Sequence, residues 1–308
     1  MKTSLKLLLS LIATLVILIL VAIIGPLFND WLQLDATAFL RFVFVGVGLA
    51  LVYVIYLFTK DNKAWEVGTR EVVYMAIGAA LYAIFAYLFN GTVFVVPSVS
   101  QVALRPAIVI PMFFGYAFGP VVGLFSGAVG NMFGDALTGF GLSPQWSVGN
   151  GLIGMIAGMH MLFSSRKKSM DMILVISGVL TVLFAVVYLT NRNQPNMLFF
   201  DVENDIYGDA QITLFAGLAI VVGFLIALAI RLFVKNENVA AAVTWATLGN
   251  ILGIGFAAIS DIWINGYSFA VAIVGEFLPA AGTNLLFAAI LLPLVVIAYE
   301  SIQKQSGR

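Results

Sequence analysis

The sequence predicts an all-α polytopic membrane protein. Its 308 residues are 62% hydrophobic and only 10% charged, and the mean hydropathy is +1.06. Soluble domains carry about 25% charged residues. Long apolar runs recur from one end of the chain to the other, and most of them approach the ~20 residues that a membrane-spanning helix needs.

Ten apolar segments are expected to form these helices. The first follows two lysines and is interpreted as a retained helix, because no small-residue cleavage site comes after it. Only Gly119 and Pro120 join the fourth and fifth, which predicts a tight hairpin. The last is too long for one straight span, and we expect a break or bend at Pro279 or Gly282. The segments are 5–27, 38–58, 71–89, 103–118, 120–137, 145–163, 172–190, 211–233, 240–263 and 268–299.

The basic residues predict the orientation of these helices. Cytoplasmic loops carry an excess of Lys and Arg. With both termini in the cytoplasm, twelve of the 15 basic residues fall inside, and only Arg41, Arg105 and Arg192 fall outside. The twelve are Lys2, Lys6, Lys60, Lys63, Arg70, Arg166, Lys167, Lys168, Arg231, Lys235, Lys304 and Arg308.

Several function classes are disfavoured by composition. The chain has no cysteine, which excludes disulfides, thiolate metal sites and cysteine nucleophiles. His160 is the single histidine, which argues against a histidine metal cluster or a Ser/His/Asp triad. No G-K-[ST] motif is present, so ATP would have to bind to another subunit. We therefore expect no catalytic residues, no cofactor, no metal and no nucleic-acid partner, and the lipid bilayer as the surroundings.

Candidate binding residues gather at the predicted outer ends of the helices. An ionised carboxylate at membrane depth costs about 3 kcal/mol unless something there needs it. Single acids and tryptophans at helix ends are ordinary interfacial residues. A whole set at one side favours an outward-facing polar cavity instead. The predicted substrate-binding residues are Asp135, Trp146, Asn150, Asp261, Glu276, Asn131 and Arg105.

Small residues recur at helical spacing in two places. Gly115, Gly119, Gly123 and Gly127 lie four residues apart, and such spacing lets helix backbones approach closely in a membrane. A second stripe in the third segment predicts a smooth docking face for another helix, either of this chain or of a partner. It consists of Ala76, Ala79, Ala80 and Ala83.

Three stretches resemble the substrate-binding S component of energy-coupling factor (ECF) transporters. "AIGAALYA" looks like the alanine stripe with which S components dock their T subunit. "LRPAIVIPMFFGYAFGPVVGLFSGAVGNMFGDALTG" followed by "WSVGNGLIGMIAGM" is similar to their second to fourth helices. "EFLPAAGTNLLFAAILLPLVVIAYE" is similar to their sixth.

The resemblance implies a six-helix core with about four additional membrane-spanning helices. Residues 71–163 would supply core helices one to four, and residues 239–308 would supply helices five and six. Residues 1–63 would form an additional N-terminal hairpin. Residues 164–238 would form an inserted helix pair with an acidic outer loop.

The resemblance also implies a mechanism and a location. An S component binds a vitamin-like micronutrient from outside, under a lid that would here be the apolar loop 90–102. It works with a T subunit and two ATPase subunits in the cytoplasmic membrane of a bacterium or archaeon. The three acids and the aromatics favour a thiamine- or pyrimidine-like ligand, and a flavin also suits the aromatics.

Two other functions remain open from the sequence. Acidic residues in membranes often carry protons or Na⁺, as in an ion-coupled secondary transporter. The acids here are predicted at outer depth instead of the midplane, which counts against that reading. An intramembrane aspartyl protease would pair Asp135 with Asp261, but "NMFGD" lacks the Gly-x-Gly-Asp signature of those enzymes.

Overall fold

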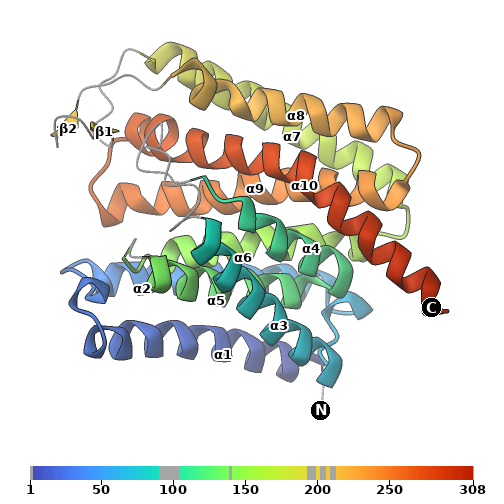
Figure 1. Cartoon of the computed structure of the whole chain (residues 1–308), viewed down its shortest axis with the longest axis horizontal. Helices are drawn as coiled ribbons and strands as arrows, with labels where there is room; N and C mark the ends of the chain where they lie inside the picture. Colours follow the sequence, from blue (N-terminus) through green and yellow to red (C-terminus); the bar gives the residue numbers. More distant parts are fainter. Residues whose placement is uncertain are drawn as a thin grey trace.

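A computed structural model describes residues 3–89, 104–138, 141–192, 199–201, 206–208 and 213–307. Over these residues, ten α-helices lie side by side as a bundle (Figure 1). They are α1 (Thr3–Ile24), α2 (Ala38–Thr59), α3 (Thr69–Ala86), α4 (Val109–Phe118), α5 (Pro120–Thr138), α6 (Pro144–Gly158), α7 (Arg166–Asn191), α8 (Leu214–Phe233), α9 (Glu237–Ile264) and α10 (Leu278–Gln305).

Short elements connect or extend these helices. The 3₁₀ turns are η1 (Gly25–Leu27), η2 (Asp30–Leu32), η3 (Lys63–Trp65), η5 (Pro106–Ile108) and η6 (Met159–Leu162), and η7 (Val271–Phe277) is a π-helix. Strands β1 (Phe199–Asp201) and β2 (Ile206–Gly208) pair antiparallel between α7 and α8, with Phe200 opposite Tyr207.

The predicted fold class is confirmed, since each predicted apolar segment coincides with a helix. Within the described residues, seven helices are long and apolar enough to cross a membrane, and α4, α5 and α6 are not among them. Helix α4 has only ten residues and α6 only 15, and the 19 residues of α5 include the polar Asn131 and Asp135. The expected irregularity near Pro279 takes the form of the π-helix η7, after which α10 begins at Leu278.

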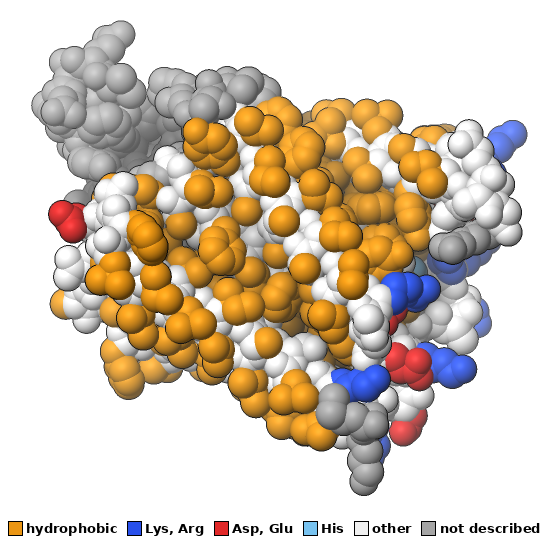
Figure 2. Space-filling model, turned by 60° about the horizontal axis from the view of Figure 1, so that its bottom comes forward, with side chains coloured by type: hydrophobic (Ala, Val, Ile, Leu, Met, Phe, Trp, Pro, Cys, Tyr) orange, Lys and Arg blue, Asp and Glu red, His pale blue; other side chains and the backbone are white. Residues whose placement is uncertain are grey.

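The surface is apolar along the helices and charged at one end. Figure 2 shows hydrophobic side chains across most of one face, with lysines and arginines gathered at the end where the chain begins. The described N- and C-terminal residues both lie at this end (Figure 1). The distribution is that of a membrane protein whose apolar belt faces lipid.

Close backbone contacts join α4, α5 and α6. A Cβ added at Gly115 would lie 1.8 Å from the carbonyl oxygen of Gly154, and one added at Gly123 would lie 2.2 Å from the same oxygen. Gly119 turns the chain between α4 and α5 with φ of 108°. The predicted role of these glycines in tight helix packing and in the hairpin is confirmed.

Helix α9 is the central member of the bundle. In the most apolar stretch of 18 residues of α9, 83% of the residues are buried inside the protein. The corresponding share is 33% or less in each other spanning helix. Helices α6, α7, α8 and α10 all pack against it. The hairpin α1–α2 packs on α5 and α6, and the pair α7–α8 packs on α9 and α10. These two pairs therefore lie on opposite edges of the bundle (Figure 1).

Candidate functional site

A first polar cluster lies inside the bundle at the end opposite the lysines. We call it the Arg105 cluster. It is built from the segment before η5 and from helices α3, α5 and α6. Its members are Tyr82, Arg105, Asn131, Asp135, Ser147 and Asn150. Apart from Arg105, whose side chain is 22% exposed, these residues are buried.

An ion pair neutralises the buried aspartate of this cluster. Nη2 of Arg105 lies 2.9 Å from Oδ1 of Asp135. Asn131, one helical turn before Asp135 on α5, donates from Nδ2 to Oδ2 of that carboxylate at 2.7 Å. Oδ1 of Asn131 in turn accepts from Nη1 of Arg105 at 2.7 Å. Arginine is therefore what allows Asp135 to be buried, because an unpaired buried charge would be strongly destabilising.

Amide and hydroxyl groups extend the network across three helices. Tyr82 of α3 donates its hydroxyl toward Oδ1 of Asn150 at 3.0 Å and Oδ1 of Asn131 at 3.3 Å. Nδ2 of Asn131 also donates to Oγ of Ser147 at 3.1 Å. Tyr82 and Ser147 were not predicted from sequence. In an apolar helix, a tyrosine is usually interpreted as a core residue. The burial of Tyr82 is what indicates a polar role, because a buried tyrosine hydroxyl needs a hydrogen-bond partner.

A second polar cluster surrounds Asp261. We call it the Asp261 cluster, and it comprises Gln145, Trp146, Asp261 and Glu276. Gln145 and Trp146 follow Pro144 in the first turn of α6, and Asp261 lies in the last turn of α9. Gln145 donates from Nε2 to Oδ1 of Asp261 at 3.0 Å, and Trp146 donates from Nε1 to Oδ2 at 2.7 Å. Both oxygens of this carboxylate are thus hydrogen-bonded.

Acceptors exceed donors around Asp261. Glu276 of η7 approaches the same carboxylate. Oε2 of Glu276 and Oε1 of Gln145 are buried and have no hydrogen-bond partner among the described residues. In the loop before η7, burial and the nearby Glu276 and Asp261 raise the pKa of Tyr267 to about 12, so its phenol remains neutral. The cluster can accept further hydrogen bonds from a ligand that carries donors.

All seven predicted binding residues lie in these two clusters, which are joined through α6. Nδ2 of Asn150 donates to the backbone oxygen of Trp146 at 2.9 Å, and Trp146 belongs to the Asp261 cluster. Among the described residues, Asp135 pairs with Arg105 and Asn131, whereas Asp261 accepts from Gln145 and Trp146, so the two aspartates have separate partners. The predicted lid, loop 90–102, lies outside the described residues.

The four alanines predicted as a docking stripe do not share one face. Ala79 and Ala83 are buried, and α5 packs against them: a Cβ added at Gly130 would lie 2.8 Å from the carbonyl oxygen of Ala79. Ala76 and Ala80 are exposed, next to the exposed Ile77. Only Ala76 and Ala80 are thus available to a partner, since Ala79 and Ala83 serve packing within the chain.

Comparisons with known proteins identify the region that contains most of these residues. Residues 66–191 match the family of the ECF-type riboflavin transporter, S component. A UPF0397 protein of Aliivibrio salmonicida is 32% identical over 102 residues, which are 33% of this chain and 54% of that protein. A UPF0397 protein of Vibrio atlanticus is 34% identical over 98 residues, which are 32% of this chain and 52% of that protein.

The chain spans about half the length of the curated relatives it matches. No solved structure matches it significantly. The resemblance to S components is confirmed for residues 66–191, which include α3 to α6 and also α7. The matched region contains the whole Arg105 cluster, together with Gln145 and Trp146.

Proposed function

Because residues 66–191 match an S component, we propose that this protein is the membrane-embedded substrate-binding subunit of an ECF-type importer. The Arg105 and Asp261 clusters bind its substrate, a small water-soluble vitamin or related micronutrient. The observation that carries the proposal is the polar network itself. Buried polar groups from α3, α5, α6 and α9 converge at one end of an otherwise apolar bundle, and most of them lie in the matched region.

The electrostatics of the two clusters define the ligand that fits. Arg105 already compensates the charge of Asp135, so this cluster favours a neutral or zwitterionic group with both donors and acceptors. The Asp261 cluster has unused acceptor oxygens on Gln145 and Glu276 and favours a group with N–H or O–H donors. A flavin fits this combination and also the description of the matched family. A thiamine- or pyrimidine-like compound is the second class to test.

The orientation follows from the basic end of the bundle. Lysines and arginines favour the cytoplasmic side, so the termini lie inside and the two clusters open to the outside. A partner T subunit docks at the exposed face around Ala76 and Ala80 and carries the two ATPases. Cysteines introduced at the exposed Ser164 and Ser268 would test the orientation against a cysteine-free background. We expect labelling from inside and outside respectively, and labelling of both from one side would contradict it.

Ligand identification tests the binding proposal. The purified protein is denatured and the released small molecules are identified by mass spectrometry. Riboflavin and thiamine are then titrated into ligand-free protein. Trp146→Ala and Asn150→Ala should each weaken binding about 5- to 150-fold, because losing one partner of a buried hydrogen bond costs about 1–3 kcal/mol.

Trp263→Ala is the matched control for the tryptophan. Trp263 lies near Asp261 in sequence, but its side chain is 59% exposed and contacts Phe44, with ring centroids 5.7 Å apart. Its loss should leave affinity unchanged. Unchanged affinity in Trp146→Ala and Asn150→Ala, with both proteins folded, would refute the assignment of the site.

An ion-coupled secondary transporter is the second candidate function. The observation that favours it is the contact of Glu276 with Asp261, since two adjacent acids in a membrane are suited to carry a proton or Na⁺. Uptake by this chain alone in proteoliposomes, driven by a proton or Na⁺ gradient and lost in Glu276→Gln, would favour it. Uptake that needs partner subunits and ATP would favour the ECF proposal.

A further inference from the structure

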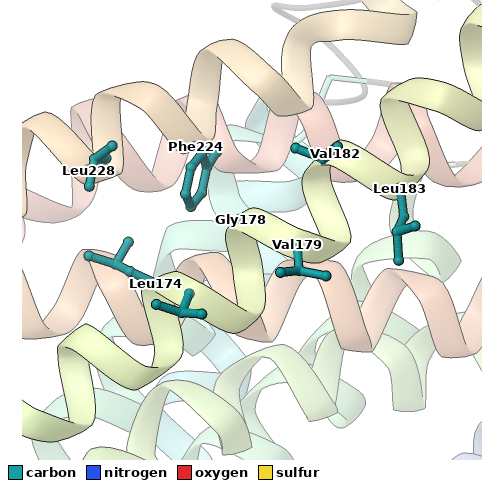
Figure 3. Close-up of a pocket in the computed structure, with 8 residues that line it drawn as sticks. Leu174, Gly178, Val179, Val182, Leu183, Phe224 and Leu228 are labelled. Carbon is teal, nitrogen blue, oxygen red and sulfur yellow. The ribbon is translucent and has the colours of Figure 1, made fainter.

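An apolar groove of about 500 Å³ runs between α7 and α8, on the edge of the bundle. Gly178 forms part of its floor, and the ring of Phe224 and the side chain of Leu228 line it from α8 (Figure 3). Val179 and Val182 are 56% and 63% exposed. The other lining residues are Leu174, Val175 and Leu183. Because both helices are long and apolar enough to span the membrane, the groove faces lipid.

The length of the groove corresponds to one leaflet of a bilayer. Its α7 wall extends over the ten residues from Leu174 to Leu183, and the nine steps between them span about 14 Å of α-helix at ~1.5 Å per residue. The hydrocarbon core of a bilayer is about 30 Å thick. The groove is therefore about as long as half of the hydrocarbon core, which is the depth that a single acyl chain reaches from the near membrane surface.

Basic side chains gather at the ends of α7 and α8 that lie nearest to Leu174 and Leu228. Nη2 of Arg231 on α8 lies 2.7 Å from Oδ1 of Asp171 on α7, and this ion pair bridges the two helices. Each partner lies three residues from a lining leucine, Leu228 or Leu174. Lys167, Lys168 and Lys235 are exposed at the same end. This end of the two helices thus carries five positive charges, on Arg166, Lys167, Lys168, Arg231 and Lys235, and two negative charges, on Asp171 and Glu237.

We propose that this groove binds an anionic phospholipid of the surrounding bilayer. One acyl chain lies along the groove against Gly178, Val182 and Phe224, and the phosphate lies among Lys167, Lys168 and Arg231. Basic pockets between spanning helices are suited to anionic headgroups. The inference does not depend on the substrate proposed above, because the residues that line the groove belong to α7 and α8 and to neither the Arg105 cluster nor the Asp261 cluster.

Lipid binding to the purified, delipidated protein tests the proposal. Dioleoylphosphatidylglycerol and dioleoylphosphatidylcholine are titrated separately in detergent, and bound lipid is counted by native mass spectrometry. The wild type should prefer phosphatidylglycerol. The double variant Lys167→Gln/Lys168→Gln should bind it about 30-fold more weakly, as two charges at ~1 kcal/mol each imply. Val182→Phe should fill the groove and weaken binding of both lipids.

Two controls separate groove binding from general effects. Ile176→Phe adds the same ring to an exposed position of α7 that does not line the groove, and Lys304→Gln removes a charge from the end of α10. Both should leave lipid binding unchanged. Equal binding of the two lipids by the wild type, or full binding in Val182→Phe, would overturn the proposal. Loss of a partner subunit in Val182→Phe with phosphatidylglycerol binding intact would overturn it too, since the groove would then hold a partner helix.

Discussion

Replacing Asp135 by Asn tests whether the Arg105–Asp135 pair supports the fold. The change keeps the size of the side chain but removes the carboxylate that lies 2.9 Å from the guanidinium of Arg105. Removing one partner of a buried ion pair costs about 3–5 kcal/mol. Arg105 is 22% exposed and Asp135 only 5%, so we expect the lower end of this range, about 3 kcal/mol. At ~2 °C per kcal/mol for a chain of this size, the apparent Tm should fall by about 6 °C.

Asp171→Asn is the matched control for this experiment. It removes an aspartate from another arginine pair, at 2.7 Å, but the side chain of Asp171 is 55% exposed. Exposed pairs contribute at most about 1 kcal/mol. The assay is tryptophan fluorescence during thermal unfolding in one detergent for both variants. In Arg105→Gln/Asp135→Asn, the two losses should be less than additive, because each single change already removes the same ion pair. Equal shifts for Asp135→Asn and Asp171→Asn, or additive losses in the double variant, would refute the reasoning.

Three further changes test other parts of the structure. Tyr82→Phe should weaken ligand binding about 5-fold through the loss of one hydroxyl donor, at ~1 kcal/mol, and an unchanged Kd in calorimetry would exclude Tyr82 from the site. Gly154→Val should abolish recovery of folded protein in size-exclusion chromatography, since a Cβ there would lie 2.3 Å from the carbonyl oxygen of Gly123. Gly46→Val should be tolerated, because a Cβ there meets no described atom within 4 Å. Similar recovery of the two variants would contradict the packing of α5 on α6. Ala80→Trp should prevent co-purification with a T subunit while ligand binding persists, because Ala80 is exposed. Ala79→Trp should disturb the packing of α3 on α5 and reduce both co-purification and ligand binding. Loss of ligand binding in Ala80→Trp would refute docking of the T subunit at Ala80.

Much of the fold was predictable because bilayers impose simple rules on sequence. Runs of apolar residues mark the helices, and Gly119-Pro120 marks the hairpin between α4 and α5. The four-residue glycine spacing in Gly115, Gly119 and Gly123 predicts close helix contact, which the structure confirms. Each of these signals is local, so neighbouring residues are sufficient to read it.

The pairing of the polar residues was not predictable from such signals. The depth of a residue in the membrane follows from its position along its helix. This was sufficient to place the candidate binding residues near the predicted outer ends of the helices. Which side chain faces which depends on how the helices pack. Arg105 is 30 residues from Asp135 in sequence, and nothing local links them. Helical phase likewise divides neighbours such as Ala79 and Ala80, which face the protein interior and the surface respectively.

The glycine contacts between α5 and α6 restrict how this protein can move. At Gly127, an added Cβ would lie 2.3 Å from the carbonyl oxygen of Asn150, so the two main chains touch beside the Arg105 cluster. At this contact no side chain lies between the two helices that could change rotamer and fill space. If the helices slid or moved apart, a void would therefore open between them. Asn131, Asp135, Ser147 and Asn150 are therefore carried on one stiff body. Any rearrangement at this end of the bundle then displaces that body as a whole, or moves α3, α9 and η7 relative to it, while the spacing between the two helices stays fixed.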